Sequence, residues 1–290
     1  MATATPTQPA LRVPRVTRPL ALWHLLSLDA PTVAALWTWF IARASHVRLP
    51  EAATVAMAVA VWMLYAADRM LDAQSNQQDT LEARHIFHHR HRSAFLAGIF
   101  TASITLALLL PRLDTQSIHL YLILGGLVFG YFILIHAARS AHRMPKEIAV
   151  GICFAAATFI PTVARRPDLR LSLAAPALLF AALCSLNCLF IYAWEHPALH
   201  RALDSSHPPH AMTRLALRHL RPMTVFLVLA ATAQAVLGPH APWPIPLASA
   251  ISGALLLVLD RCRDLIPPTT LRATADFVLL TPLALIPFIR

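Results

Sequence analysis

The chain is short of charge. Only 13% of its 290 residues are Asp, Glu, Lys or Arg, while 57% are hydrophobic. An average soluble domain is about 25% charged, so this composition excludes an ordinary soluble enzyme. Acids are the scarcer charge, with 14 Asp and Glu against 24 Lys and Arg. An acid inside an apolar stretch of such a chain therefore marks a candidate for function or pairing.

Cysteine is also sparse. The four cysteines are scattered, which excludes a disulfide framework. Cys184 and Cys188 share one helix face, and a role as small hydrophobic residues is favoured over metal ligation. Residues 1–19 are rich in Thr, Pro and Arg and lack the apolar core and cleavage site of a signal peptide. We expect a flexible tail over 1–19, a single transmembrane domain over 20–290, and no soluble domain.

Long uncharged runs are abundant. Their lengths predict an all-α, polytopic membrane protein built as a bundle of about nine transmembrane helices. The expected spans are 20–41, 52–67, 93–110, 117–137, 148–164, 171–193, 223–238, 244–259 and 274–289.

The basic residues orient this bundle. With the N-terminus in the cytoplasm, the tail and the loops on its side hold 17 of the 24 Lys and Arg. This asymmetry follows the positive-inside rule and predicts a cytoplasmic N-terminus. The composition, rich in Ala, Arg and Leu, suggests a bacterial source, so we expect a multi-pass protein of the bacterial inner membrane. The net charge of +10 is then explained by topology and by attraction to anionic lipid headgroups. Nucleic acid is not an expected partner.

Two carboxylates end the second expected span. Asp68 and Asp72 are four residues apart, so a helix places them on one face, roughly 6 Å from each other. Such a pair is unfavourable unless a cation lies between the carboxylates, and Mg²⁺ is a common occupant that brings substrate phosphates with it. This pair predicts a site for a lipid diphosphate at the cytoplasmic rim.

The sixth expected span ends in a similar way. Tyr65 precedes Asp68 by three residues, and Tyr192 precedes Glu195 by three residues, 127 positions further on. Each acid is followed by a long cytoplasmic loop that ends in a basic patch. The pattern predicts two pseudo-repeats, over about 20–137 and 148–259, with the site between the halves.

These features resemble the UbiA superfamily of intramembrane prenyltransferases. Members of that family have nine membrane helices and acid-rich motifs at the cytoplasmic ends of helices two and six. Asp68 and Asp72 match two acids of the first motif. In the second motif, Asn187 matches the asparagine and Glu195 the last acid, while Cys188 and Ile191 replace the acids between them. A shift of one turn would pair Glu195 with Asp68 instead, and both alignments remain open.

The resemblance implies Mg²⁺-dependent transfer of an isoprenoid from its diphosphate to a lipophilic acceptor, expected to be aromatic. It assigns the metal to Asp68, Asp72, Glu195 and Asn187. Positive charge around the diphosphate is expected from Arg69, Lys146 and Arg84. Aromatic faces that could hold an allylic cation are those of Trp62, Tyr65 and Tyr192.

Asp29 lies within the first expected span. An acid at that depth is functional or paired, so Asp29 is a candidate for the substrate pocket. Pro31 follows two residues later and is expected to kink the segment, which leaves a structural role for Asp29 open.

Two alternatives come from the loops and from the weak second motif. Nine of the fifteen histidines lie in the two loops that follow the acids, including His85, His88 and His89. Clustered imidazoles suit iron, so a membrane di-iron oxygenase resembling a desaturase is the second hypothesis. The third is a UbiA-like membrane protein without catalytic activity, because the second motif retains few of its acids.

Overall fold

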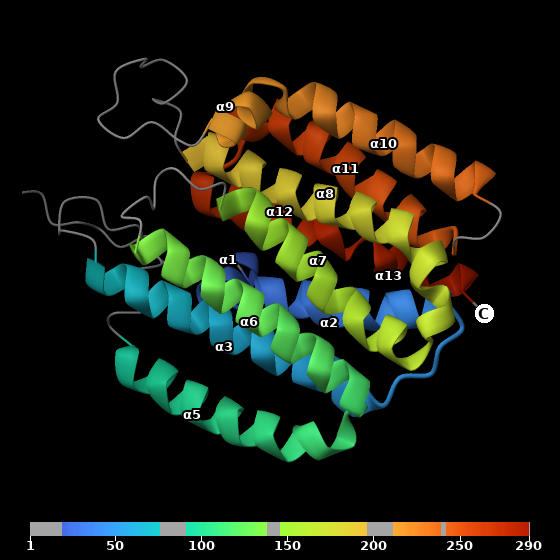
Figure 1. The fold of residues 1–290 in the computed structure, drawn as a ribbon. Coiled ribbons are helices and arrows are strands. Elements are labelled where there is room, and N and C mark those ends of the chain that lie inside the picture. Colours follow the sequence, from blue (N-terminus) through green and yellow to red (C-terminus); the bar gives the residue numbers. More distant parts are fainter. Residues whose placement is uncertain (1–18, 76–90, 138–145, 196–210, 239–241, 290) are drawn as a thin grey trace, which may run out of the picture.

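The structure is a computed structural model, and it describes residues 19–75, 91–137, 146–195, 211–238 and 242–289. These residues are almost entirely helical, and no strand occurs among them (Figure 1). The predicted all-α class is therefore confirmed for the described part of the chain.

The helices follow one another in the order that the apolar runs predict. They are α1 (Pro19–Leu25), α2 (Asp29–Ala44), α3 (Glu51–Ser75), α5 (Arg92–Leu109), α6 (Thr115–Ala137), α7 (Lys146–Arg165), α8 (Arg170–Glu195), α9 (Ala211–Arg218), α10 (Leu220–Leu237), α11 (Pro244–Arg261), α12 (Pro268–Phe277) and α13 (Pro282–Leu285).

Seven helical segments of the described chain are long and apolar enough to cross a membrane, fewer than the nine expected. They are Glu51–Met70, Arg92–Arg112, Lys146–Arg165, Pro167–Glu195, Leu220–Leu237, Pro244–Arg261 and Thr270–Phe288. The expected span at 20–41 is outside this set because the helix breaks after α1 and leaves α2 with 16 residues. The expected span at 117–137 forms α6, whose last turn lies beyond the described side chains.

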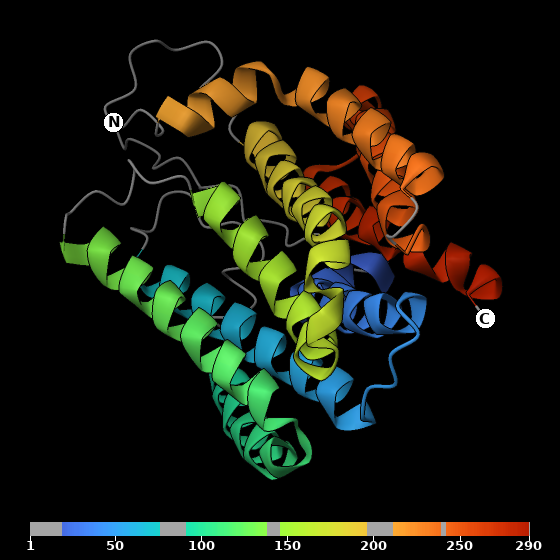
Figure 2. The same ribbon diagram turned by 45° about the vertical axis from the view of Figure 1, so that its right-hand side comes forward.

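Apolar side chains cover the outside of the bundle. Phe100 and Leu108 of α5 are 68% and 69% exposed, and Phe226 and Val236 of α10 are 72% and 75% exposed. These two helices lie at opposite edges of the bundle in both views (Figures 1 and 2). Soluble monomers rarely expose apolar surface on this scale, whereas lipid tails would cover it at no cost. The surface is that of a membrane protein.

Large aromatic residues fill the centre between α2, α7 and α8. Trp37 is fully buried and stacks on Phe180, with ring centroids 4.0 Å apart. Gly151 lies where α7 crosses α8, and a β-carbon there would collide with the backbone of Ser185. A small residue at a helix crossing lets two backbones approach, as is common in membrane bundles.

Proline interrupts α7, and a neighbouring helix compensates. Pro161 has no N–H, so the Ala157 carbonyl one turn earlier loses its helical donor. The Tyr121 hydroxyl of α6 donates to that carbonyl at 3.2 Å. Without water in the membrane, a side-chain donor of this kind is what makes an internal proline tolerable.

The same compensation occurs where the last span breaks before Pro282. The Ser252 hydroxyl of α11 donates to the Val278 carbonyl at 2.9 Å, and the Trp37 indole donates to the Leu279 carbonyl at 2.8 Å. These donors replace helical N–H groups that the break removes. They also fix α12 against α2 and α11, which positions the polar residues of α12.

Candidate functional site

Three helix ends lie on the same side of the bundle. The C-terminal ends of α3 and α8 and the N-terminal end of α7 all point to the left of Figure 1. Asp68 and Asp72 belong to the first of these ends, Glu195 to the second and Lys146 to the third. The chain thus places its sequence-predicted acids at the same end, on the two helices that carry the motifs.

The first polar contacts at this end close the break between α1 and α2. Ser27 has a φ of 58°, its N–H bonds the His24 carbonyl, and the Leu28 N–H bonds the Trp23 carbonyl. This pair of hydrogen bonds is a Schellman motif, which ends a helix with one left-handed residue. The break therefore precedes Pro31, which lies in the first turn of α2, where a missing N–H costs nothing. The expected kink at Pro31 is wrong for that reason.

Arg69 of α3 holds this break in place. One of its guanidinium nitrogens donates to the His24 carbonyl at 2.7 Å and to the Ser27 hydroxyl at 2.9 Å. The other approaches Asp29 at 3.5 Å. Trp62, two helical turns earlier on the same face, donates to the Leu26 carbonyl at 3.1 Å. Arg69 is 6% exposed, so these contacts hold it in the interior and away from bulk water.

Asp29, the first residue of α2, is buried among donors. His24 Nδ1 lies 2.5 Å from its Oδ2, and the Ala30 N–H donates to its Oδ1 at 3.0 Å. Together with Arg69, these contacts compensate the negative charge of the carboxylate. Asp29 is therefore a paired acid.

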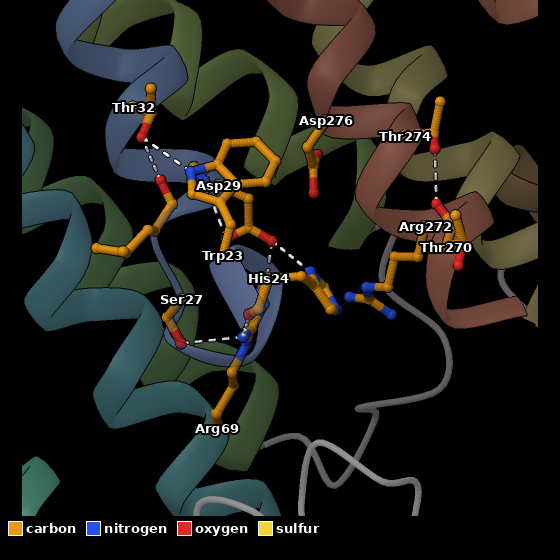
Figure 3. A network of polar contacts seen from close by, with 12 residues as sticks. Trp23, His24, Ser27, Asp29, Thr32, Arg69, Thr270, Arg272, Thr274 and Asp276 are labelled. Atoms are coloured by element: carbon orange, nitrogen blue, oxygen red, sulfur yellow. Dashed lines mark hydrogen bonds and ion pairs between the residues drawn. The ribbon is translucent and has the colours of Figure 1, made fainter. Parts of the chain in front are cut away.

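A second polar group reaches the same place from α12 (Figure 3). The side chain of Asp276 accepts a hydrogen bond from Asn187 of α8 at 3.1 Å. One turn earlier on α12, Arg272 pairs with Glu195 at the end of α8. The two motif residues of α8 are thus both engaged by α12.

The two groups converge on one cluster. Three potential ligand atoms lie within 4.8 Å of one another, one each from His24, Asp29 and Asp276. A histidine and two carboxylates at this spacing can share a proton or bind a metal ion.

Two of the three predicted aromatic residues have packing partners among the described residues. Trp62 stacks on Phe95 of α5, with ring centroids 6.4 Å apart. Tyr65 is half-buried and packs against the core around Ala34 and Met57. Tyr192 is half-buried on α8.

The remaining predicted residues are surface residues or lie outside the described chain. Asp68 is exposed on α3, and Lys146 is exposed at the start of α7. Asp72 belongs to α3, but its side chain is outside the described residues. Arg84 and the loop histidines, among them His85, His88 and His89, also lie outside them. The oxygenase hypothesis therefore stays a prediction, as does the convergence of Asp68 and Asp72 on Glu195.

Sequence reasoning missed His24, Arg272 and Asp276. Asp276 carried a signal of the same kind as Asp29, because it is an acid inside the expected span 274–289. His24 and Arg272 carried none, since single basic residues near a helix end are explained by topology alone.

No family model, no curated protein and no solved structure matches this chain. The site must therefore be interpreted from its own chemistry.

Proposed function

We propose that the protein is a UbiA-like membrane prenyltransferase with about nine transmembrane helices, each long enough to cross a bilayer. It transfers an isoprenoid from its diphosphate to a lipophilic, aromatic acceptor. One observation carries the proposal: the polar side chains of α8 pair with those of α12, Asn187 with Asp276 and Glu195 with Arg272, on the helix whose end lies on the same side of the bundle as the end of α3. Polar residues are costly in a membrane interior and are retained there for function.

The bundle suits a substrate with an apolar tail and a polar head. The isoprenoid chain lies between apolar helices, and the diphosphate lies at the rim beside the ends of α3 and α8. The allylic carbon–oxygen bond breaks, and the diphosphate leaves with the electron pair. A carbon of the acceptor ring then bonds to the allyl cation, and the ring proton passes to the released diphosphate.

The residues of the rim divide this work. The exposed ammonium of Lys146 attracts the diphosphate, whereas Arg272 is paired with Glu195 and holds the end of α8 against α12. The Tyr65 ring, one helical turn before Arg69 on α3, is the aromatic face assigned to the allyl cation. Arg69 is committed to Ser27, Asp29 and the His24 carbonyl, so it supports the pocket wall and does not contact the diphosphate.

The donor set of α3 fits Mg²⁺. Asp68 is exposed at the rim, and Asp72 follows it four residues later on α3, a spacing that favours carboxylate oxygens on one helix face. Asp68 and Asp72 would hold Mg²⁺, which would supply positive charge to the departing diphosphate. Asn187 is buried on Asp276, so it lines the wall between the two halves.

The positive-inside count supports a rim that faces the cytoplasm, with the N-terminus on the same side, and the proposed location is a bacterial inner membrane. Soluble isoprenoid diphosphates reach the site from that side, and the acceptor enters from the lipid.

Diphosphate binding tests the proposal. Purified protein in nanodiscs is titrated with geranyl, farnesyl and geranylgeranyl diphosphate, with Mg²⁺ and with EDTA, by calorimetry. We expect binding only with Mg²⁺, and a loss of about 100-fold in affinity in the double variant Asp68→Asn, Asp72→Asn, the scale of a lost metal clamp.

The matched control is Asp264→Asn, which removes an acid that is 88% exposed after α11. It should bind as the wild type does. Equal binding by the double variant and the wild type would contradict the mechanism, and the histidine loops would then be the place to test for iron.

A further inference from the structure

A cluster apart from the α3 acid pair lies deeper in the bundle. His24 ends α1, Asp29 begins α2 and Asp276 is on α12, and one potential ligand atom of each lies within 4.8 Å of the others. His24 and Asp29 are 4% and 1% exposed. Figure 3 shows Asp276 extending from α12 toward the other two. Three elements from the two ends of the chain thus bring metal-binding side chains to one point.

Asp29 has cationic and polar neighbours, whereas Asp276 has no ion pair among the described residues. Asp29 has donors in His24, Arg69 and the Ala30 N–H, whereas Asp276 receives the Asn187 amide. Two carboxylates in an apolar environment disfavour joint ionisation unless a proton or a metal ion is shared. Arg272, the nearby cation of α12, is already paired with Glu195.

Asn187 supplies an independent observation. It is 4% exposed, and its amide N–H₂ donates to Asp276 Oδ1. Its Oδ1 is buried and has no hydrogen-bond partner among the described residues. A carboxylate accepts only from N–H₂, so Asp276 fixes the orientation of the amide, and flipping the Asn187 side chain would lose this hydrogen bond. An amide oxygen without a donor, on a side chain that contacts Asp276, is available as a metal ligand.

We propose that His24, Asp29, Asp276 and the Asn187 oxygen form a binding site for a first-row divalent transition metal ion. Imidazole nitrogen favours such metals over Mg²⁺ and Ca²⁺. Ligand bonds of about 2.0–2.2 Å place opposite donors about 4.4 Å apart, so the three side chains need to move only slightly to enclose an ion. The ion replaces the His24–Asp29 hydrogen bond, and Arg69 then orients Asp29 from outside, as partners of ligating carboxylates commonly do.

This site is independent of the proposed transferase activity and of its Mg²⁺. It joins α1, α2, α8 and α12, so an ion bound there would fix these four helices against one another.

Metal binding to the full chain in detergent tests the proposal. The protein is stripped with EDTA and titrated with Mn²⁺ and Zn²⁺, without any diphosphate, and bound metal is measured by mass spectrometry. We expect one tight equivalent in the wild type and in the Asp68→Asn, Asp72→Asn variant. His24→Gln and Asp276→Asn should each weaken that binding by about 100-fold, as expected for loss of a ligand.

Two further measurements separate this site from the loop histidines. Pulsed EPR of bound Mn²⁺ should show coupling to a histidine nitrogen that His24→Gln removes and His88→Ala, His89→Ala retains. Asn187→Asp keeps the shape of the side chain and adds a charged ligand, so it should bind Mn²⁺ at least about tenfold more tightly. This variant also decides the matter if His24→Gln does not fold.

Absence of any tight equivalent in the wild type overturns the site and identifies Asp29 and Asp276 as a proton-sharing pair. Tight metal that survives His24→Gln and Asp276→Asn, or that is lost in the loop variant alone, overturns it as well. Failure of diphosphate binding leaves the site standing, because its test uses metal alone.

Discussion

Arg69 is the residue on which the break between α1 and α2 depends. Its guanidinium contacts a carbonyl, a hydroxyl and a carboxylate, all from the short segment between His24 and Asp29. A buried arginine is stable only when its donors are satisfied and its charge is compensated. The segment from His24 to Asp29 meets both conditions, because it supplies acceptors for the donors of Arg69 and a carboxylate for its charge.

Removing Arg69 should therefore be severe. Arg69→Met keeps the bulk of the side chain but strands Asp29 and the His24 carbonyl in the interior, and we expect a loss of about 3 kcal/mol in the free energy of unfolding. Unfolding of the purified protein by SDS titration in mixed micelles measures it.

Arg165→Met is the matched control, because it breaks an ion pair with Asp114 whose side chains are 45% and 34% exposed. It should cost less than about 1 kcal/mol. Similar losses for the two variants would show that the interior contacts of Arg69 contribute no more than a surface pair.

At the scale of the element, the prolines decide which helices must be neighbours. Pro161 leaves the Ala157 carbonyl to Tyr121, and the break before Pro282 leaves carbonyls to Ser252 and Trp37. In each case a side chain of one helix donates to a backbone carbonyl of another helix. Internal proline therefore specifies a helix contact in this chain as well as a bend.

A double-mutant cycle tests this pairing. Tyr121→Phe should lower the free energy of unfolding by about 1 kcal/mol, because it leaves the Ala157 carbonyl without a donor. Pro161→Ala restores the backbone N–H, so Tyr121→Phe should then cost little. The coupling of about 1 kcal/mol between the two positions is the quantity to measure. Additive effects of the two substitutions would contradict the compensation.

At the scale of the molecule, the segment between α7 and α8 and the segment after α11 lie at opposite ends of the bundle (Figure 1). The basic residues predict that the second of these faces the cytoplasm.

Cysteine labelling tests that orientation. In a Cys262→Ser background, Asp168→Cys should react with a membrane-impermeant maleimide in intact spheroplasts, because it belongs to the outward-facing segment. Asp264→Cys should react only after the membrane is opened. Both side chains are well exposed, at 59% and 88%, so a difference reports the membrane and not burial. The reverse pattern would invert the topology, and labelling of both in intact spheroplasts would exclude it.

The sequence by itself determined the helical class, the membrane character and the order of the helices. Runs of about 20 apolar residues without charge have one stable form in lipid, because a helix bonds all its backbone groups internally. The acids at the ends of α3 and α8 also followed from the sequence, since helix periodicity places Asp68 and Asp72 on one face. These properties are local, so a local pattern predicts them.

The tertiary structure alone decided which polar residues share the interior. Asp29 and Asp276 stand near opposite ends of the chain, and no spacing rule connects α2 with α12. The break before α2 was likewise invisible, because Ser27 has a left-handed conformation that glycine would have signalled. That conformation is held by Arg69 from another helix. Pairing in a membrane interior is set by which helices pack together, and packing is settled only when the whole bundle has formed.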